Sequence, residues 1–438
     1  MEKSDARVVC ISIEDGEILK RKQPATLRLL QQRRDHRPII HSIKVAIALV
    51  LVSLLYLQKD LYDEVGDNAM WAIMTVVVLY EFTAGATLGK GLNRGIGTIL
   101  GGSVGMLTGL LSQRAGRRAN AVVLGISIFF IGAIASYTRF IPTIKKKYDY
   151  GVMIFILTFN LIAVSGYRGE EIVKLAGDRL STVGMGFAVC VATSFFICPV
   201  WAGDNLHRSL VTKFENITVS LEGCLAEYFK TNNQKTAVKT KRSISNGYIS
   251  VLHSKDADAA MANFASWEPW HGRFGFYYPW DKYLQISETL RQLAACVLSL
   301  HSCVQSVQQS PEWIRRSFEK PCTNLGEAIV CALSELGESI HKMRRCHSLA
   351  SVIGKSLQAM AEELRTALIE PLPHSQDIGL VVERRKKGEE EEVMGGAGLG
   401  DALAVAAFAY MLLEMEEKVQ DLAKSVEELG TIAGFKPQ

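Results

Sequence analysis

Long apolar runs fall within the first 200 residues of this 438-residue chain, and apolar positions at helical spacing follow them. The first run, residues 39–57, reaches the length of about 20 residues that an α-helix needs to cross a hydrocarbon core. Five further runs occupy residues 68–82, 85–111, 121–137, 150–165 and 180–200. The pattern therefore predicts a mostly α protein with six transmembrane helices at 39–200, after a cytosolic N-terminal segment at 1–38.

Two of these runs differ from a plain apolar helix. The run at 68–82 is short and ends near Glu81, which predicts a tilted, re-entrant or protein-shielded helix. In the run at 85–111, Gly97, Gly101, Gly105 and Gly109 recur at every fourth position and share one helix face. Because a glycine face lets a second helix approach closely in a membrane, it favours helix packing over a flexible gate.

Beyond residue 200 the pattern changes to amphipathic helices. Residues 206–229, 286–307 and 349–368 carry apolar side chains at three- and four-residue spacing, which is typical of helices packed in water. An aromatic segment at 267–283 is predicted to bury its rings. Charged residues and glycines at 383–400 predict a mobile loop, and a last helix is expected at about 401–429. Residues 201–438 thus form a predicted cytosolic helical domain with a regulatory role.

The charge distribution predicts the topology. Residues 1–200 hold 23 Lys and Arg against 15 Asp and Glu, whereas residues 201–438 hold 26 against 30. Basic residues cluster before the first apolar run and at 145–147, so the positive-inside rule puts both termini in the cytosol. The arginines at 114, 117 and 118 then fall on the far side, against the rule. A basic membrane half fits contact with anionic lipid, or a path for anions.

Signatures of catalysis and of metal binding are absent from the sequence. It has no phosphate-binding G-x-x-x-x-G-K-[ST] loop, no H-E-x-x-H motif and no nucleophile elbow. Its nine cysteines form no C-x-x-C pair, and its nine histidines show no spacing typical of metal ligands. The basic residues are accounted for by membrane flanks, so no nucleic acid is expected. We therefore predict neither an enzyme nor a cofactor-binding protein.

Ionisable residues inside apolar runs are costly and are candidates for function. Lys90 and Arg94 lie four residues apart near the start of the third run, and Arg179 heads the sixth. They could line an aqueous path and replace part of the hydration shell of an anion. Alternatively, they could reach the headgroups or pair with Glu81, Asp149 and Asp178. The residues alone leave both readings open.

A polar, basic stretch in the second half offers a candidate modification site. Ser243 and Ser245 follow Lys241 and Arg242 in a segment read as a loop. This arrangement is compatible with phosphorylation, although polar loops of this kind are common.

Four segments resemble the plant aluminium-activated malate transporter family. They are MWAIMTVVVLYEFTAGATLGKGLNRGIGT at 70–98, YDYGVMIFILTFNLIAVSGYR at 148–168, RLSTVGMGF with CPVWAGDNLH between 179 and 207, and WEPWHGRF at 267–274. The resemblance implies a dimeric anion channel in the lipid bilayer, which passes malate and related anions passively through a basic pore. The pore residues that it implies are Lys90, Arg94 and Arg179.

The resemblance also raises further candidates. Glu81, Asp149 and Lys174 could act in a secondary part of the pore or in gating. Aluminium would need hard carboxylate oxygens on the non-cytosolic side, where Asp63, Glu170 and Glu171 form a candidate rim. The family includes proteins of the plasma membrane and of the vacuolar membrane, and the sequence does not choose between them.

Two other functions remain open at this stage. A coupled exporter of organic or aromatic acids, resembling bacterial fusaric acid resistance proteins, would use Glu81 or Asp149 as proton carriers. A non-conducting membrane anchor would use its helical domain to recruit partners.

Overall fold

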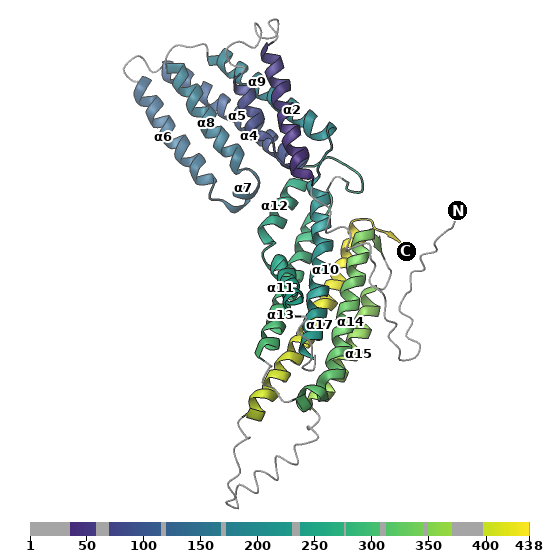
Figure 1. The fold of residues 1–438 in the computed structure, drawn as a ribbon. Coiled ribbons are helices and arrows are strands. Elements are labelled where there is room, and N and C mark those ends of the chain that lie inside the picture. Colours follow the sequence, from purple (N-terminus) through teal and green to yellow (C-terminus); the bar gives the residue numbers. More distant parts are fainter. Residues whose placement is uncertain are drawn as a thin grey trace, which may run out of the picture. The chain divides into compact units, whose positions relative to one another are not determined.

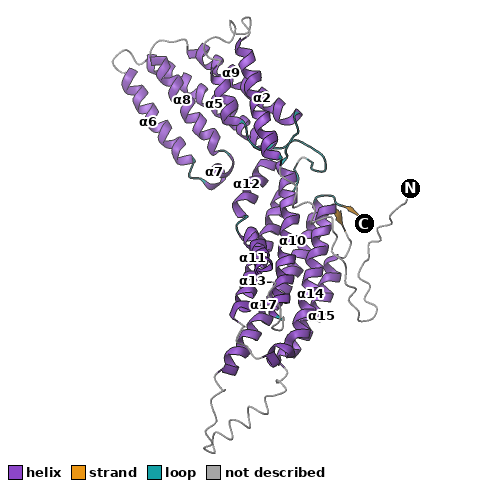
Figure 2. Ribbon diagram, in the orientation of Figure 1, coloured by secondary structure: helices purple, strands orange, loops and turns teal. Residues whose placement is uncertain are grey.

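The computed structural model describes residues 36–57, 70–114, 120–167, 172–229, 237–275, 277–306, 312–345, 349–369 and 397–437. The regular secondary structure of this part of the chain is helical, apart from one short parallel pair of strands and an isolated bridge (Figures 1 and 2). The described residues from Lys44 onward belong to one compact unit, and every contact discussed below lies within it.

Six apolar helices occupy the positions of the six predicted apolar runs. They are α2 (Arg37–Leu57), α4 (Met70–Leu79), α5 (Ala84–Arg114), α6 (Asn120–Thr138), α8 (Asp149–Tyr167) and α9 (Ile172–Phe196), with the short α7 (Pro142–Lys147) between α6 and α8. Among the described residues, four helices (α2, α5, α6 and α9) are long and apolar enough to cross a membrane, and α4 and α8 hold shorter apolar stretches. The mostly α class is confirmed, and the count of six spans stays a prediction.

The short run at 68–82 forms a helix of only 10 residues, α4. At 1.5 Å per residue this helix is about 15 Å long, half the thickness of a hydrocarbon core. It ends because the chain turns at residues 80–83, where the backbone N–H of Glu81 donates to Thr87 Oγ1 at 3.1 Å. Ala72, Val76 and Leu79 are buried, so protein shields one side of α4.

The glycine face of α5 packs against α8. A Cβ added to Gly101 would lie 2.6 Å from the carbonyl oxygen of Phe155, and one added to Gly105 would lie 3.0 Å from that of Phe159. A Cβ on Gly97 would collide with the carbonyl oxygen of Gly151. These glycines therefore allow two backbones to touch, which is the packing role that their spacing predicts.

The C-terminal helices form the largest hydrophobic core of the described residues. They are α10 (Ala202–Tyr228), α11 (Ala237–Leu252), α12 (Lys255–Ala265), α13 (Trp280–Ser306), α14 (Glu312–Lys342), α15 (Leu349–Ile369) and α17 (Ala397–Ile432). Strands β1 (Arg344–Arg345) and β2 (Lys436–Pro437) pair in parallel. Figure 1 shows α10, α13, α14, α15 and α17 as neighbours, in agreement with their contacts.

Three helices of this group differ from the sequence expectation. The sequence analysis predicted no helix at 312–342, where the structure has the amphipathic helix α14 with Pro321 inside it. The basic stretch read as a loop contains α11, so Ser243 and Ser245 lie on a helix. Helix α17 begins at Ala397, inside the loop predicted at 383–400, although Gly398 and Gly400 have low helix propensity. The rest of that predicted loop, 383–396, lies outside the described residues.

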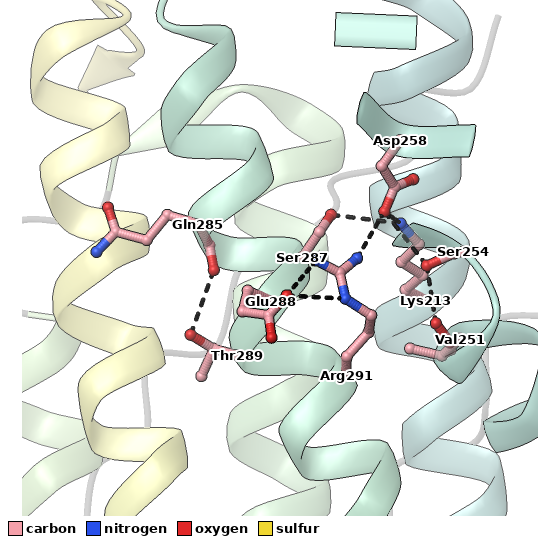
Figure 3. A network of polar contacts seen from close by, with 9 residues as sticks. All are labelled: Lys213, Val251, Ser254, Asp258, Gln285, Ser287, Glu288, Thr289 and Arg291. Atoms are coloured by element: carbon pink, nitrogen blue, oxygen red, sulfur yellow. Dashed lines mark hydrogen bonds and ion pairs between the residues drawn. The ribbon is translucent and has the colours of Figure 1, made fainter. Parts of the chain in front are cut away.

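A buried polar network joins α10, α12 and α13 (Figure 3). Asp258 forms ion pairs with Lys213 and with Arg291, the latter at 3.0 Å between Nη1 and Oδ2. Lys213 Nζ also donates to Ser287 Oγ at 3.3 Å, and Arg291 Nη2 pairs with Glu288 at 2.6 Å. Two cations and two carboxylates thus balance in this network, in which Lys213 and Asp258 are buried and Glu288 is half exposed.

Candidate functional site

Arg94 lies inside the apolar helices and not at their ends. It sits on α5 and is only 6% exposed. Its Nη1 donates to the hydroxyl of Tyr150 on α8 at 3.2 Å, and its Nε has no hydrogen-bond partner among the described residues. The side chain therefore does not extend to the headgroups, and its charge is only partly solvated by the protein.

Arg179 is buried in the same group of helices. It is 4% exposed, and its guanidinium carbon lies 4.1 Å from the ring centroid of Trp71 on α4, which is a cation–π contact. The sequence placed it at the head of the sixth helix, and the stretch of α9 that is long and apolar enough to cross a membrane begins near it, at Gly177. Helix α9 itself begins seven residues before Arg179, at Ile172.

Neither guanidinium pairs with a carboxylate of the residues that the structure describes. Within the described ranges, no Asp or Glu forms an ion pair with Arg94 or Arg179, and the two arginines repel each other electrostatically. A buried cation without a counter-charge costs several kcal/mol, so such a pair is expected where an anion supplies the missing charge. Arg94 and Arg179 thus form the candidate anion site.

Three other predicted ionisable residues of this region, Lys90, Glu81 and Asp149, form ion pairs. Lys90 forms an ion pair with Glu81, and both side chains are about one-third exposed. Asp149 receives two hydrogen bonds from Arg139, at 2.7 and 3.0 Å. For Lys90 the pairing alternative therefore describes the geometry, and neither carboxylate forms an ion pair with Arg94 or Arg179.

One buried cation was missed by the sequence analysis. Lys44 lies on α2 within the first apolar run and is 3% exposed. No ion pair with its ammonium group occurs among the described residues. Its position inside an apolar run was the same signal that selected Lys90 and Arg94, and could have found it.

Several predicted residues cannot be placed. The candidate aluminium rim lies outside the described residues, since it consists of Asp63, Glu170 and Glu171. Lys174 and Ser243 lie in α9 and α11, but their side chains are outside the description, whereas Ser245 is half-buried on α11. Within the described part of the chain, no group of three His, Cys, Asp or Glu side chains could hold a metal ion.

The segment WEPW, residues 267–270, contacts both α5 and the first of the C-terminal helices, α10. Glu268 accepts hydrogen bonds from the backbone N–H groups of Ala202, at 2.6 Å, and Gly203, at 3.0 Å. These two residues begin α10, so the carboxylate satisfies donors that a helix start leaves free. Burial raises the pKa of the Glu268 carboxyl, and the two N–H groups oppose that shift.

The same segment touches the start of α5. A Cβ on Gly85 would lie 2.6 Å from Cγ of Glu268, and one on Gly89 would lie 2.8 Å from Cδ1 of Trp267. A larger residue at Gly85 or Gly89 would thus collide with Glu268 or Trp267 of the WEPW segment. We call Glu268, Trp267, Gly85 and Gly89 the α5 joint.

The aromatic residues that follow are buried for the most part. Phe274, Trp280 and Tyr283 belong to the core, as the sequence predicted, whereas Trp270 and Tyr277 are exposed. His207 on α10 bonds to the hydroxyl of Tyr283 at 3.0 Å. Burial, with a smaller contribution from His341, lowers the pKa of His207 to about 4.

The structure is that of a multi-pass membrane protein. Several of its helices are long and apolar enough to cross a membrane, and cationic side chains are buried between them. The family model described as Aluminium activated malate transporter matches residues 31–393. The chain therefore belongs to the aluminium-activated malate transporter family, which is a family of transport proteins and not of enzymes.

Individual relatives agree with this assignment. The chain is 36% identical over 523 aligned positions to aluminum-activated malate transporter 13 of Arabidopsis thaliana. This alignment covers 99% of the chain and 97% of the relative. It is 41% identical over 336 positions to transporter 12 of the same plant, covering 77% and 60%. Aluminum-activated malate transporter 1 of Triticum aestivum is 34% identical over 407 positions, covering 92% and 84%.

Proposed function

We propose that this protein is an anion channel that passes malate, and other organic or inorganic anions, passively across a plant membrane. The observation that carries the proposal is the burial of Arg94 and Arg179 with no carboxylate in ion-pair contact among the described residues. The names of the relatives, which are malate transporters, supply the substrate class.

The physical basis is electrostatic compensation. At an effective dielectric constant of 20, two unit charges 4 Å apart attract by about 4 kcal/mol, and the cost of stripping water from a carboxylate opposes this gain. Because the attraction is partly offset by this dehydration cost, an anion can enter the site and leave it again, as conduction requires. Arg179 contacts Trp71, and Arg94 donates to Tyr150. Neither contact neutralises the positive charge, so both guanidiniums can still attract a passing anion.

We further propose that two copies form the conducting unit, with both termini in the cytosol and the C-terminal helices as a cytosolic regulatory domain. One face of α5 supports the dimer, since Leu92, Ile96, Ile99, Leu100 and Leu107 are exposed there and need either lipid or a second copy. The basic segment before the first apolar run supports the topology. The membrane is the plasma membrane or the vacuolar membrane.

Electrophysiology tests the proposal. Cells that express the protein should carry a malate-dependent current, and Arg94→Gln and Arg179→Gln should each reduce it at least tenfold while protein at the membrane stays constant. Arg114→Gln is the matched control, because Arg114 is the exposed last residue of the same helix α5. Unchanged current and selectivity in both variants would refute the role of these arginines.

The same recording separates the channel from a coupled exporter. An exporter needs a carboxylate that gains and loses a proton, whereas Glu81 pairs with Lys90 and Asp149 with Arg139. A channel current should therefore reverse at the malate equilibrium potential regardless of the proton gradient. Malate flux that follows an imposed proton gradient would favour the exporter.

A further inference from the structure

The connection between α6 and α8 presents apolar and basic side chains to its surroundings. Phe140 is 79% exposed and Tyr137 is 72% exposed, although both follow an apolar helix. The last turn of α7 carries Lys145, Lys146 and Lys147, all exposed. We call residues 137–148 the basic connection.

The basic connection carries more positive charge than the one carboxylate that follows it, Asp149, can balance. Asp149 is the acidic residue that follows directly, and Arg139 occupies both of its carboxylate oxygens, at 2.7 and 3.0 Å. Within the described residues, none of the three lysines forms an ion pair. Lys147 lies over the ring of Trp267, 4.8 Å from its centroid, whereas the side chains of Lys145 and Lys146 are exposed.

The location sets the kind of partner. The basic connection joins α6, a helix long enough to cross a membrane, to the apolar helix α8, so it lies where these helices leave the bilayer. Exposed rings beside lysines are typical of segments that insert into the boundary between headgroups and acyl chains. A soluble anion would account for the lysines and would leave Phe140 in water.

We propose that the basic connection binds anionic phospholipid headgroups of the adjacent leaflet. Lys145 and Lys146 contact the phosphate groups, and Phe140 with Ile141 occupies the acyl boundary beneath them. Juxtamembrane Lys residues strengthen such binding about fivefold each, so the pair contributes about 25-fold.

The bound headgroup would lie next to the α5 joint. Asn263 on α12 donates to the backbone carbonyl of Lys146 at 3.1 Å, and Lys147 covers the Trp267 ring that packs on Gly89 of α5. Lipid binding at these lysines therefore restrains the segment that connects the C-terminal helices to α5. If the proposed conduction holds, anionic lipid changes the malate current through this contact, and that part rests on the proposed function.

Binding can be measured without any current. The purified full-length protein in detergent is titrated with dioctanoyl phosphatidylinositol phosphate, with dioctanoyl phosphatidylcholine, and with the free inositol phosphate headgroup. Wild-type protein should bind the anionic lipid tightest and lose affinity as salt rises. Lys145→Gln/Lys146→Gln should bind it about 25-fold more weakly, and Phe140→Ser should weaken binding of the lipid but not of the headgroup.

Lys320→Gln/Lys355→Gln is the matched control, because both lysines are exposed on C-terminal helices, and it should bind as the wild type does. Should the double variant not fold, the salt dependence of the wild type and the single Lys145→Gln variant decide the question. Equal affinity of wild type and lysine variant would overturn the proposal. A free headgroup that binds as tightly as the lipid would also overturn it, in favour of a soluble anion site.

Discussion

Removal of the Glu268 carboxylate tests how the C-terminal helices are anchored. In Glu268→Ala, the backbone N–H groups of Ala202 and Gly203 lose their acceptor, and both residues are buried. A buried donor without a partner costs about 1.5 kcal/mol, so the two together should lower the free energy of unfolding by about 3 kcal/mol. For a domain of this size, such a loss lowers Tm by about 6–12 °C.

The assay is thermal unfolding of the full-length protein in detergent, followed by tryptophan fluorescence. Trp201 stacks on His271 at 4.0 Å between ring centroids, and Trp280 lies against Tyr283, so the signal reports on this region. Glu268→Gln keeps one carbonyl oxygen as acceptor and should lose about half as much, roughly 1.5 kcal/mol.

Glu362→Ala is the matched control, because its carboxylate is exposed and pairs with Arg365 at 3.5 Å. Exposed pairs of this kind contribute less than about 1 kcal/mol. If Glu268→Ala unfolded within 2 °C of the control, the carboxylate would not be what holds the start of α10. If Glu268→Gln were as damaging as Glu268→Ala, the negative charge, and not the hydrogen bonds, would be the important feature.

Three further predictions concern the fold around the site. Burial lowers the pKa of His207 to about 4, below its ordinary value near 6.5, so the unfolded chain binds the proton more readily than the folded chain. The free energy of unfolding should therefore be highest above pH 6.5 and should be about 2 kcal/mol lower at pH 5. His207→Gln should remove that part of the slope of Tm against pH between 6.5 and 5, and an unchanged slope would contradict the assignment. Asp258→Asn leaves Lys213 and Arg291 buried without their shared counter-charge and should destabilise the protein by about 3–5 kcal/mol in denaturant unfolding, whereas exposed Asp421→Asn should not. Gly101→Ala should separate α5 from α8 and reduce the yield of monodisperse protein, while Gly132→Ala on α6, with no atom within 4 Å of the added Cβ, should have no effect; equal yields would show that the backbones can move apart.

Local pattern was sufficient for much of the architecture. Each of the six apolar runs became a helix, because hydropathy and a 3.6-residue period depend only on residues close in sequence. The glycines at 97, 101 and 105 were recognisable as a packing face for the same reason. The family was also readable from contiguous segments, and the family match confirms it.

The partners of the charged side chains were decided by the tertiary structure. From the sequence, Lys90, Arg94 and Arg179 were equivalent candidates. The fold pairs Lys90 with Glu81, whereas Arg94 contacts Tyr150 and Arg179 contacts Trp71. Arg94 and Tyr150 are 56 positions apart in sequence, and Glu268 and Ala202 are 66 apart. A period within one helix indicates which face a residue occupies, whereas the identity of the side chain opposite depends on how separate helices pack. Since a buried charge is stabilised or destabilised by whatever lies within a few ångströms of it, only the packed helices could separate the two unpaired arginines from the paired lysine.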